Sequence, residues 1–158
     1  GSFIGKSTFS MAFAADIYSN EHKCIIYCCD YSNEINFPNI TSTKIKQFHK
    51  KSSTEMFRNF ESDQKIDLLH LDGRLQNEDY DLLKNKFTEK TILILDDFEG
   101  NEKGVVNFNN LLNNNLISRK SHFLIYPVQE ETKTKYGLLE KSTSAVLIPS
   151  GSLRISAQ

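Results

Sequence analysis

The stretch IDLLHLDG, from Ile66 to Gly73, decides the fold class of this chain. Its apolar run is short and stops at an acid followed by glycine, as expected for a strand that is buried in a sheet and ends in a loop. The stretch TILILDD, from Thr91 to Asp97, repeats the pattern, and HKCIIYCC stops at Asp30 in the same way. Because the carboxyl ends of parallel strands meet at one edge of a sheet, we expect these acids to lie beside a ligand.

The segments between these strands carry apolar residues at helical spacing. Helices are expected over residues 7–18, 53–60, 77–87 and 103–116. A weaker strand is expected over KIKQFHK, and two further strands, SHFLIYPV and SAVLIPSG, follow the last helix. Strands that alternate with helices predict an α/β fold with a mostly parallel sheet and helices on both faces. Since no repeat or linker divides the chain, we predict a single domain over residues 1–158.

The composition argues against several kinds of protein. The 158 residues include 19 basic and 20 acidic side chains, and the net charge of −1 gives no field that would attract nucleic acid. No apolar run approaches the roughly 20 residues that a membrane span needs. Cys24, Cys28 and Cys29 lack the paired spacing of metal sites, so we expect buried strand thiols in a reducing compartment. These features predict a soluble, cytoplasmic protein.

A glycine-rich turn, GSFIGKST, opens the chain and runs into the first helical pattern. Turns of this kind hold nucleotides, and two interpretations are open. In a phosphate loop, Lys6 and the backbone amides would surround phosphates, and Ser7 would bind magnesium. In the other interpretation the turn holds S-adenosylmethionine. Because such turns normally follow a buried strand, the first strand of the sheet is expected to be missing or clipped before Gly1.

The middle of the chain favours the second interpretation. KIDLLHLDGRL, followed by LKNKFTEKTILILDDFEG and read with GSFIGKST, resembles the class I S-adenosylmethionine-dependent methyltransferases. Within that class it is most similar to the metal-assisted O-methyltransferases of the macrocin type. The resemblance runs from Gly1 to about Val106. It implies a Rossmann-like sheet that ends in an antiparallel strand pair, in one S-adenosylmethionine-binding domain.

The resemblance also implies which residues bind the cofactor. Residues of the opening turn would lie beneath its methionine portion, namely Gly1, Ser2, Phe3 and Gly5. Asp30 would accept hydrogen bonds from the ribose hydroxyls, as an acid does in dinucleotide-binding sheets. Ser53 would lie near the adenine.

Three acids at strand ends, Asp72, Asp96 and Asp97, are predicted to ligate a divalent metal such as magnesium. Three carboxylates at one sheet edge repel each other unless a cation lies among them, and hard oxygen ligands suit magnesium, calcium or manganese. Such a metal would lower the pKa of a substrate hydroxyl and orient its oxygen.

Catalytic roles are predicted for Asp72, His70 and Arg74. Strand alternation places His70 on the same face as Asp72, either as a site residue or as a hydrogen-bonded strand histidine. Arg74 would pair with the carboxylates, with an anionic substrate, or with a surface acid. Relatives often carry an acid and a histidine where Arg74 and Leu75 stand, so the identity of the base is open.

The sequence therefore predicts metal-assisted transfer of a methyl group from S-adenosylmethionine to a hydroxyl of a small molecule. No nucleic acid or membrane partner is expected, and a homo-oligomer is left open. Two alternatives remain. One is a phosphate-loop NTPase or kinase, and the other is a non-catalytic, methyltransferase-like binding domain.

Overall fold

A computed structural model describes residues 6–18, 24–31, 41–118, 122–127 and 143–148. Every helix and strand expected from the sequence has a counterpart in these ranges. In chain order they are α1 (Lys6–Tyr18), β1 (Ile25–Asp30), β2 (Lys44–His49), α2 (Ser53–Arg58), β3 (Leu68–Leu71), α3 (Asn77–Leu83), β4 (Ile92–Leu95), α4 (Lys103–Asn113), β5 (His122–Pro127) and β6 (Thr143–Ile148). None of the helices in these ranges is long and apolar enough to cross a membrane.

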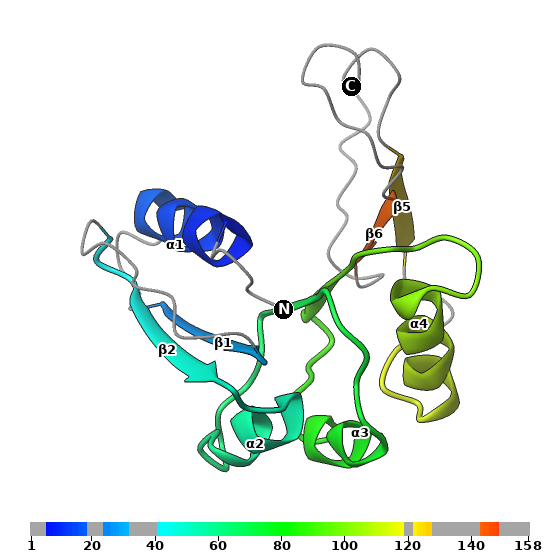
Figure 1. The fold of residues 1–158 in the computed structure, drawn as a ribbon, viewed down its shortest axis with the longest axis horizontal. Coiled ribbons are helices and arrows are strands. Elements are labelled where there is room, and N and C mark those ends of the chain that lie inside the picture. The colour runs from blue at the N-terminus through cyan, green and yellow to red at the C-terminus, as the bar shows by residue number, and fades with distance from the viewer. Residues whose placement is uncertain (1–5, 19–23, 32–40, 119–121, 128–142, 149–158) are drawn as a thin grey trace. The chain divides into compact units, whose positions relative to one another are not determined.

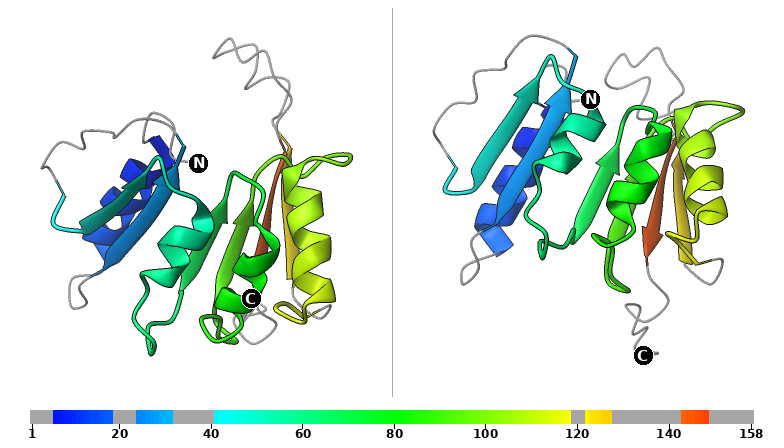
Figure 2. Two further views of the ribbon diagram at one scale, coloured as in Figure 1. Left: turned by 60° about the horizontal axis from the view of Figure 1, so that its bottom comes forward. Right: turned by 90° about the horizontal axis from the view of Figure 1, so that it is seen from below.

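The chain forms two compact units, residues 1–60 and residues 61–158. The first unit holds a two-stranded sheet, in which β1 and β2 run parallel and Asp30 pairs with His49 at their carboxyl ends. Helices α1 and α2 lie on opposite faces of this sheet (Figures 1 and 2). The single domain expected over the whole chain stays a prediction.

Aromatic side chains fill much of the first unit on the α2 side. The ring of Tyr27 on β1 lies 4.3 Å from that of Phe60 and 6.4 Å from that of Phe48, measured between centroids. Phe57 of α2 is buried and meets Phe60 edge to face. Aromatic pairs at such distances stabilise a core beyond the area that they bury.

The second unit holds a four-stranded sheet in the order β3-β4-β6-β5. Strands β3 and β4 are parallel, whereas β6 runs antiparallel to both β4 and β5. The sheet is therefore mixed, and the antiparallel pairing of the last two strands agrees with the sequence-based prediction.

One face of this sheet forms the core of the second unit. Alternate strand residues are buried on that face, namely Leu69, Leu71, Leu93, Leu95, Ala145 and Leu147. Helices α3 and α4 both cover it (Figure 2) and contribute the buried side chains of Leu83 and Leu111. The other face carries half-buried and exposed side chains, among them His70 and Leu68. The described helices of this unit thus leave the His70 face uncovered.

Candidate functional site

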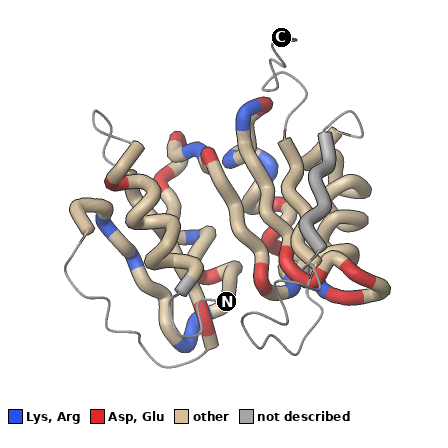
Figure 3. The backbone as a smooth tube through the Cα atoms, turned by 90° about the horizontal axis from the view of Figure 1, so that it is seen from above, with Lys and Arg blue, Asp and Glu red and all other residues tan. Residues whose placement is uncertain are grey.

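Acidic residues gather beyond the carboxyl ends of β3 and β4. The two strands are parallel neighbours, with Leu71 paired to Leu95, so Asp72 and Asp96 leave the sheet side by side. Figure 3 shows the acidic positions gathered at this edge of the second unit. Helix α4 begins there too, and its first residue is Lys103. In open α/β sheets this is the edge at which ligands bind.

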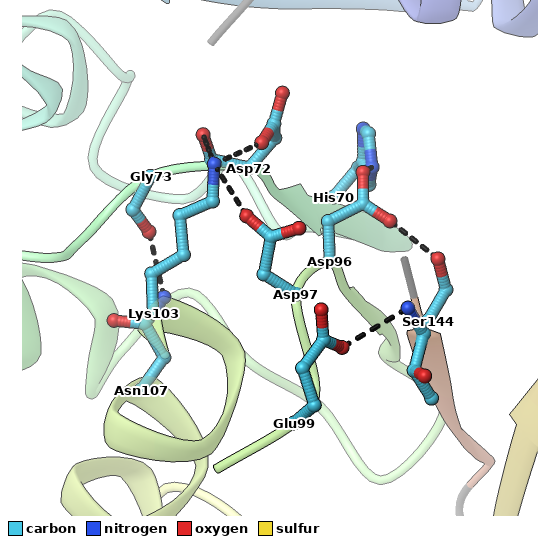
Figure 4. A network of polar contacts seen from close by, with 10 residues as sticks. His70, Asp72, Gly73, Asp96, Asp97, Glu99, Lys103, Asn107 and Ser144 are labelled. Carbon is cyan, nitrogen blue, oxygen red and sulfur yellow. Dashed lines mark hydrogen bonds and ion pairs between the residues drawn. The ribbon is translucent and has the colours of Figure 1, made fainter. Parts of the chain in front are cut away.

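The ammonium group of Lys103 lies between two of these acids (Figure 4). Its Nζ is 2.6 Å from Oδ1 of Asp72 and 2.9 Å from Oδ2 of Asp97. It also donates to the backbone oxygen of Asp72 over 3.3 Å. Three oxygens thus match the three N–H donors of an ammonium group. The hydrogen bond to Asp72, together with the one to Asp97, raises the pKa of Lys103 above its ordinary value, so this lysine stays protonated.

The carboxylate of Asp96 has other partners (Figure 4). One oxygen lies 3.0 Å from Nε2 of His70, and the other accepts a short hydrogen bond from the hydroxyl of Ser144 on β6. The hydrogen bond with His70 is the main reason that the pKa of Asp96 lies below its ordinary value, and the bond from Ser144 adds to it. Because an ionised carboxylate only accepts hydrogen bonds, Nε2 of His70 is the donor in this contact.

Asn107 fixes helix α4 against the loop that follows Asp72. Its side chain is fully buried, donates to the backbone oxygen of Gly73 over 2.7 Å and accepts from the backbone N–H of Leu75 over 3.1 Å. Asn107 stands four residues after Lys103, on the same side of the helix. The side chain that holds the loop and the side chain that holds the acids therefore belong to one helix face.

Gly104 allows the start of α4 to approach the end of β4. A Cβ at this position would lie 2.4 Å from the backbone oxygen of Asp96 and 2.9 Å from that of Asp97, so no larger residue fits without a shift of the backbone. The N–H of Gly104 donates to the oxygen of Asp97 over 3.2 Å. Asp97 itself has a φ of 52°, a left-handed conformation that aspartate tolerates better than most residues.

The predicted metal ligands do not converge on one point. Asp72 and Asp97 face Lys103, whereas Asp96 is bonded to His70 and Ser144. Within the described ranges, no group of histidines, cysteines and acids has the arrangement of a metal site. The repulsion that the sequence predicts among the acids is instead offset by an ammonium group. The residues present therefore do not fit a divalent metal held by all three carboxylates.

The expected cofactor residues belong to the first unit. Asp30 ends β1 and is half-buried. Ser53 is the first residue of α2, which follows β2 directly, so Asp30 and Ser53 lie toward the same edge of the parallel pair. Ser52 caps this helix, because its hydroxyl accepts from the N–H of Glu55 over 3.2 Å. The turn residues Gly1, Ser2, Phe3 and Gly5 lie outside the described residues.

Sequence reasoning placed some residues of this network and missed others. His70 and the three acids lie in it, but Arg74 is exposed and takes part in none of the ion pairs among the described residues. Lys103, Asn107 and Ser144 were not predicted. One signal for Lys103 was available in the sequence. It is a lysine at the start of the helix that follows an acid-ended strand, and the first turn of a helix normally favours acids over lysine.

Comparison with known proteins identifies the family. A family model described as a methyltransferase domain matches residues 1–98. The match includes the opening turn, β1 with Asp30, and both acid-ended strands of the second unit. No curated protein and no solved structure gave a match. Since the family model covers more than half of the chain, this chain belongs to the methyltransferase domain family.

Proposed function

We propose that this chain binds S-adenosylmethionine and transfers its methyl group to a hydroxyl of a small molecule. The observation that carries the proposal is the family match, which begins at the glycine-rich turn and ends just after the paired acids. A methyltransferase domain implies the use of S-adenosylmethionine. The resemblance to the macrocin type of O-methyltransferase favours a hydroxyl acceptor. The Rossmann-like sheet and the cytoplasmic location stay predictions, and a homo-oligomer stays open.

The proposed cofactor site uses the opening turn and the edge of the first sheet. Gly1, Ser2, Phe3 and Gly5 are proposed to lie beneath the methionine portion. Asp30 supports the proposal because it ends β1 at the edge where α/β sheets bind ligands. Its carboxylate would accept hydrogen bonds from the ribose hydroxyls, and Ser53, toward the same edge, would lie near the adenine.

The proposed catalytic residues are His70, Asp72 and Arg74. The cofactor supplies a methyl group that is already activated by the sulfonium charge, so the protein has to position and deprotonate an oxygen nucleophile. Asp96 holds the ring of His70 by its Nε2, which leaves Nδ1 to accept a proton from the acceptor hydroxyl. Asp72, held by Lys103, is proposed to orient the acceptor. The exposed Arg74 would bind an anionic part of that molecule.

No step in this proposal passes through a divalent metal. Two of the three acids expected to bind one surround Lys103, and the third holds His70 and Ser144. The acceptor is proposed only as a hydroxyl compound, because acceptor specificity does not follow from the fold.

The test is calorimetric titration of the purified chain with S-adenosylmethionine and, in parallel, with ATP. We expect saturable binding of S-adenosylmethionine alone. Asp30→Asn should weaken that binding by roughly 10- to 100-fold, since hydrogen bonds to a charged group contribute about 1.5–3 kcal/mol. Asp63→Asn, at an exposed acid of the second unit, is the matched control and should bind as the wild type does.

Two results would contradict the proposal. Binding of ATP alone, lost in Lys6→Ala, would favour the phosphate-loop alternative. Binding of neither compound would favour the non-catalytic, methyltransferase-like domain. If S-adenosylmethionine alone binds, as we expect, a screen of hydroxyl acceptors by transfer of a labelled methyl group follows.

A further inference from the structure

We infer that Lys103 is a built-in cation that takes the place of a divalent metal between Asp72 and Asp97, so that these acids bind such a metal only when the lysine charge is removed. The inference concerns the second unit alone. It does not depend on the proposed methyl transfer.

The first support comes from charge. Two carboxylates approach one nitrogen to 2.6 and 2.9 Å, and two carboxylates brought this close to one point repel each other unless a cation lies between them. Lys103 supplies that cation. Its side chain and those of both acids are only about one-third exposed, so water screens these interactions less than at a fully exposed ion pair.

The second support is that the position of Lys103 is fixed by the fold. Gly104 lets the helix start lie against the backbone oxygens at the end of β4. Asn107, one helical turn later, ties the same helix to the loop after Asp72. Lysine is unfavourable in the first turn of a helix, because the amino end of the helix dipole is positive. The first turn of α4 contains no acid, so the neighbouring Asp72 and Asp97 offset this cost.

The third support is the set of atoms around the ammonium. They are one carboxylate oxygen of Asp72, the backbone oxygen of Asp72 and one carboxylate oxygen of Asp97. All three are hard oxygen donors of the kind that magnesium, manganese and calcium prefer. Shortening Lys103 would therefore leave an oxygen-lined position that carries two negative charges. With Lys103 in place, the same oxygens are occupied.

The experiment titrates the full chain with Mn²⁺ alone, without S-adenosylmethionine or an acceptor, and follows binding by calorimetry and by the electron paramagnetic resonance signal of free Mn²⁺. Wild type should show no saturable site up to millimolar Mn²⁺. Lys103→Met should gain one site that binds at least ten-fold more tightly than any wild-type background. Adding Asp97→Asn to Lys103→Met should abolish that site, because it removes one of the two charged ligands.

A matched control comes from the exposed ion pair between Asp81 of α3 and Lys84, the residue that follows this helix, whose Oδ1 and Nζ atoms lie 2.5 Å apart. Lys84→Met removes a lysine charge beside an acid but leaves no second carboxylate, so it should bind no Mn²⁺. Lys103→Arg keeps the positive charge and should also bind none. Far-UV circular dichroism checks that each variant is folded, and Lys103→Gln replaces Lys103→Met if the latter is unfolded.

Two outcomes would overturn the inference. One is saturable Mn²⁺ binding by the wild type that Asp97→Asn removes, because the metal and the lysine would then not exclude each other. The other is a folded Lys103→Met or Lys103→Gln chain that gains no site. Neither result bears on binding of S-adenosylmethionine, which the calorimetric titration of the proposed function measures separately.

Discussion

The sheet of the first unit and the sheet of the second unit are built from similar apolar strands, but they bury those strands to different degrees. In β1, with the sequence IIYCCD, every residue is half-buried or exposed. In β4, with the sequence ILIL, two leucines are almost completely buried. Strand β4 lies between β3 and β6, and helices α3 and α4 cover one face of its sheet, whereas β1 pairs with β2. Burial of an apolar run therefore depends on its neighbours in the sheet as much as on its own sequence.

The largest effect is expected from removing a buried leucine of β4. Leu95 is 0% exposed, so Leu95→Ala should lower the free energy of unfolding by about 3 kcal/mol through lost burial and a new cavity. Ile25 of β1 is 41% exposed, and Ile25→Ala should cost less than about 1 kcal/mol. Urea unfolding followed by circular dichroism measures both. Equal losses for the two variants would contradict the comparison.

Asn107→Ala should have the next largest effect. The substitution leaves the N–H of Leu75 and the backbone oxygen of Gly73 without their partner, and an unsatisfied buried polar group costs about 1–3 kcal/mol. We expect a loss of about 2 kcal/mol in urea unfolding. Asn109, exposed on the same helix, provides the control Asn109→Ala, which should cost less. A loss for Asn107→Ala no larger than that for Asn109→Ala would mean that water replaces both bonds.

The sequence predicted the elements of both units because apolar periodicity and strand-ending acids are local signals. It also predicted that His70, Asp72 and the paired acids lie at one edge, since β3 and β4 are parallel neighbours. Their partners were not predictable in this way. Whether Asp97 turns toward Lys103 depends on its left-handed backbone and on the start of α4, which are set by tertiary structure.

The cysteines show the same limit in the first unit. Cys28 and Cys29 were expected to be buried strand thiols, and the structure leaves both half-buried. The sequence shows that a strand is apolar, but it does not show how much of each face is covered by helices. For the same reason, an acid at a strand end could be recognised while the lysine that neutralises it could not.

A capping substitution probes the stability of the first unit. Ser52 and Glu55 form a reciprocal pair, in which each side chain accepts from the backbone N–H of the other. Ser52→Ala should cost about 1 kcal/mol, as loss of a helix cap typically does. Ser52→Asp keeps an acceptor at this position and should restore most of the stability in urea unfolding. If Ser52→Asp were as unstable as Ser52→Ala, capping would not be the cause.

The smallest effect is expected for Asp96→Asn, and it should depend on pH. The hydrogen bond with His70 is the main cause that lowers the pKa of Asp96 below its ordinary value of 3.8. A carboxylate with a lowered pKa stabilises the folded state above its ordinary pKa, and that contribution is lost as the pH falls through the lowered value. Asp96→Asn should therefore destabilise the chain by less than about 1 kcal/mol at pH 7 and pH 5, because the partly exposed carboxylate is screened by water. At pH 3 and below, its unfolding midpoint in urea should approach that of the wild type.

Ser144→Ala removes the other donor to Asp96 and should change the stability in the same direction by less. A difference between wild type and Asp96→Asn that stays constant down to pH 2 would show that the charge of Asp96 does not stabilise the fold, and that the buried leucines and the strand pairing of β4 hold this part of the second unit without it.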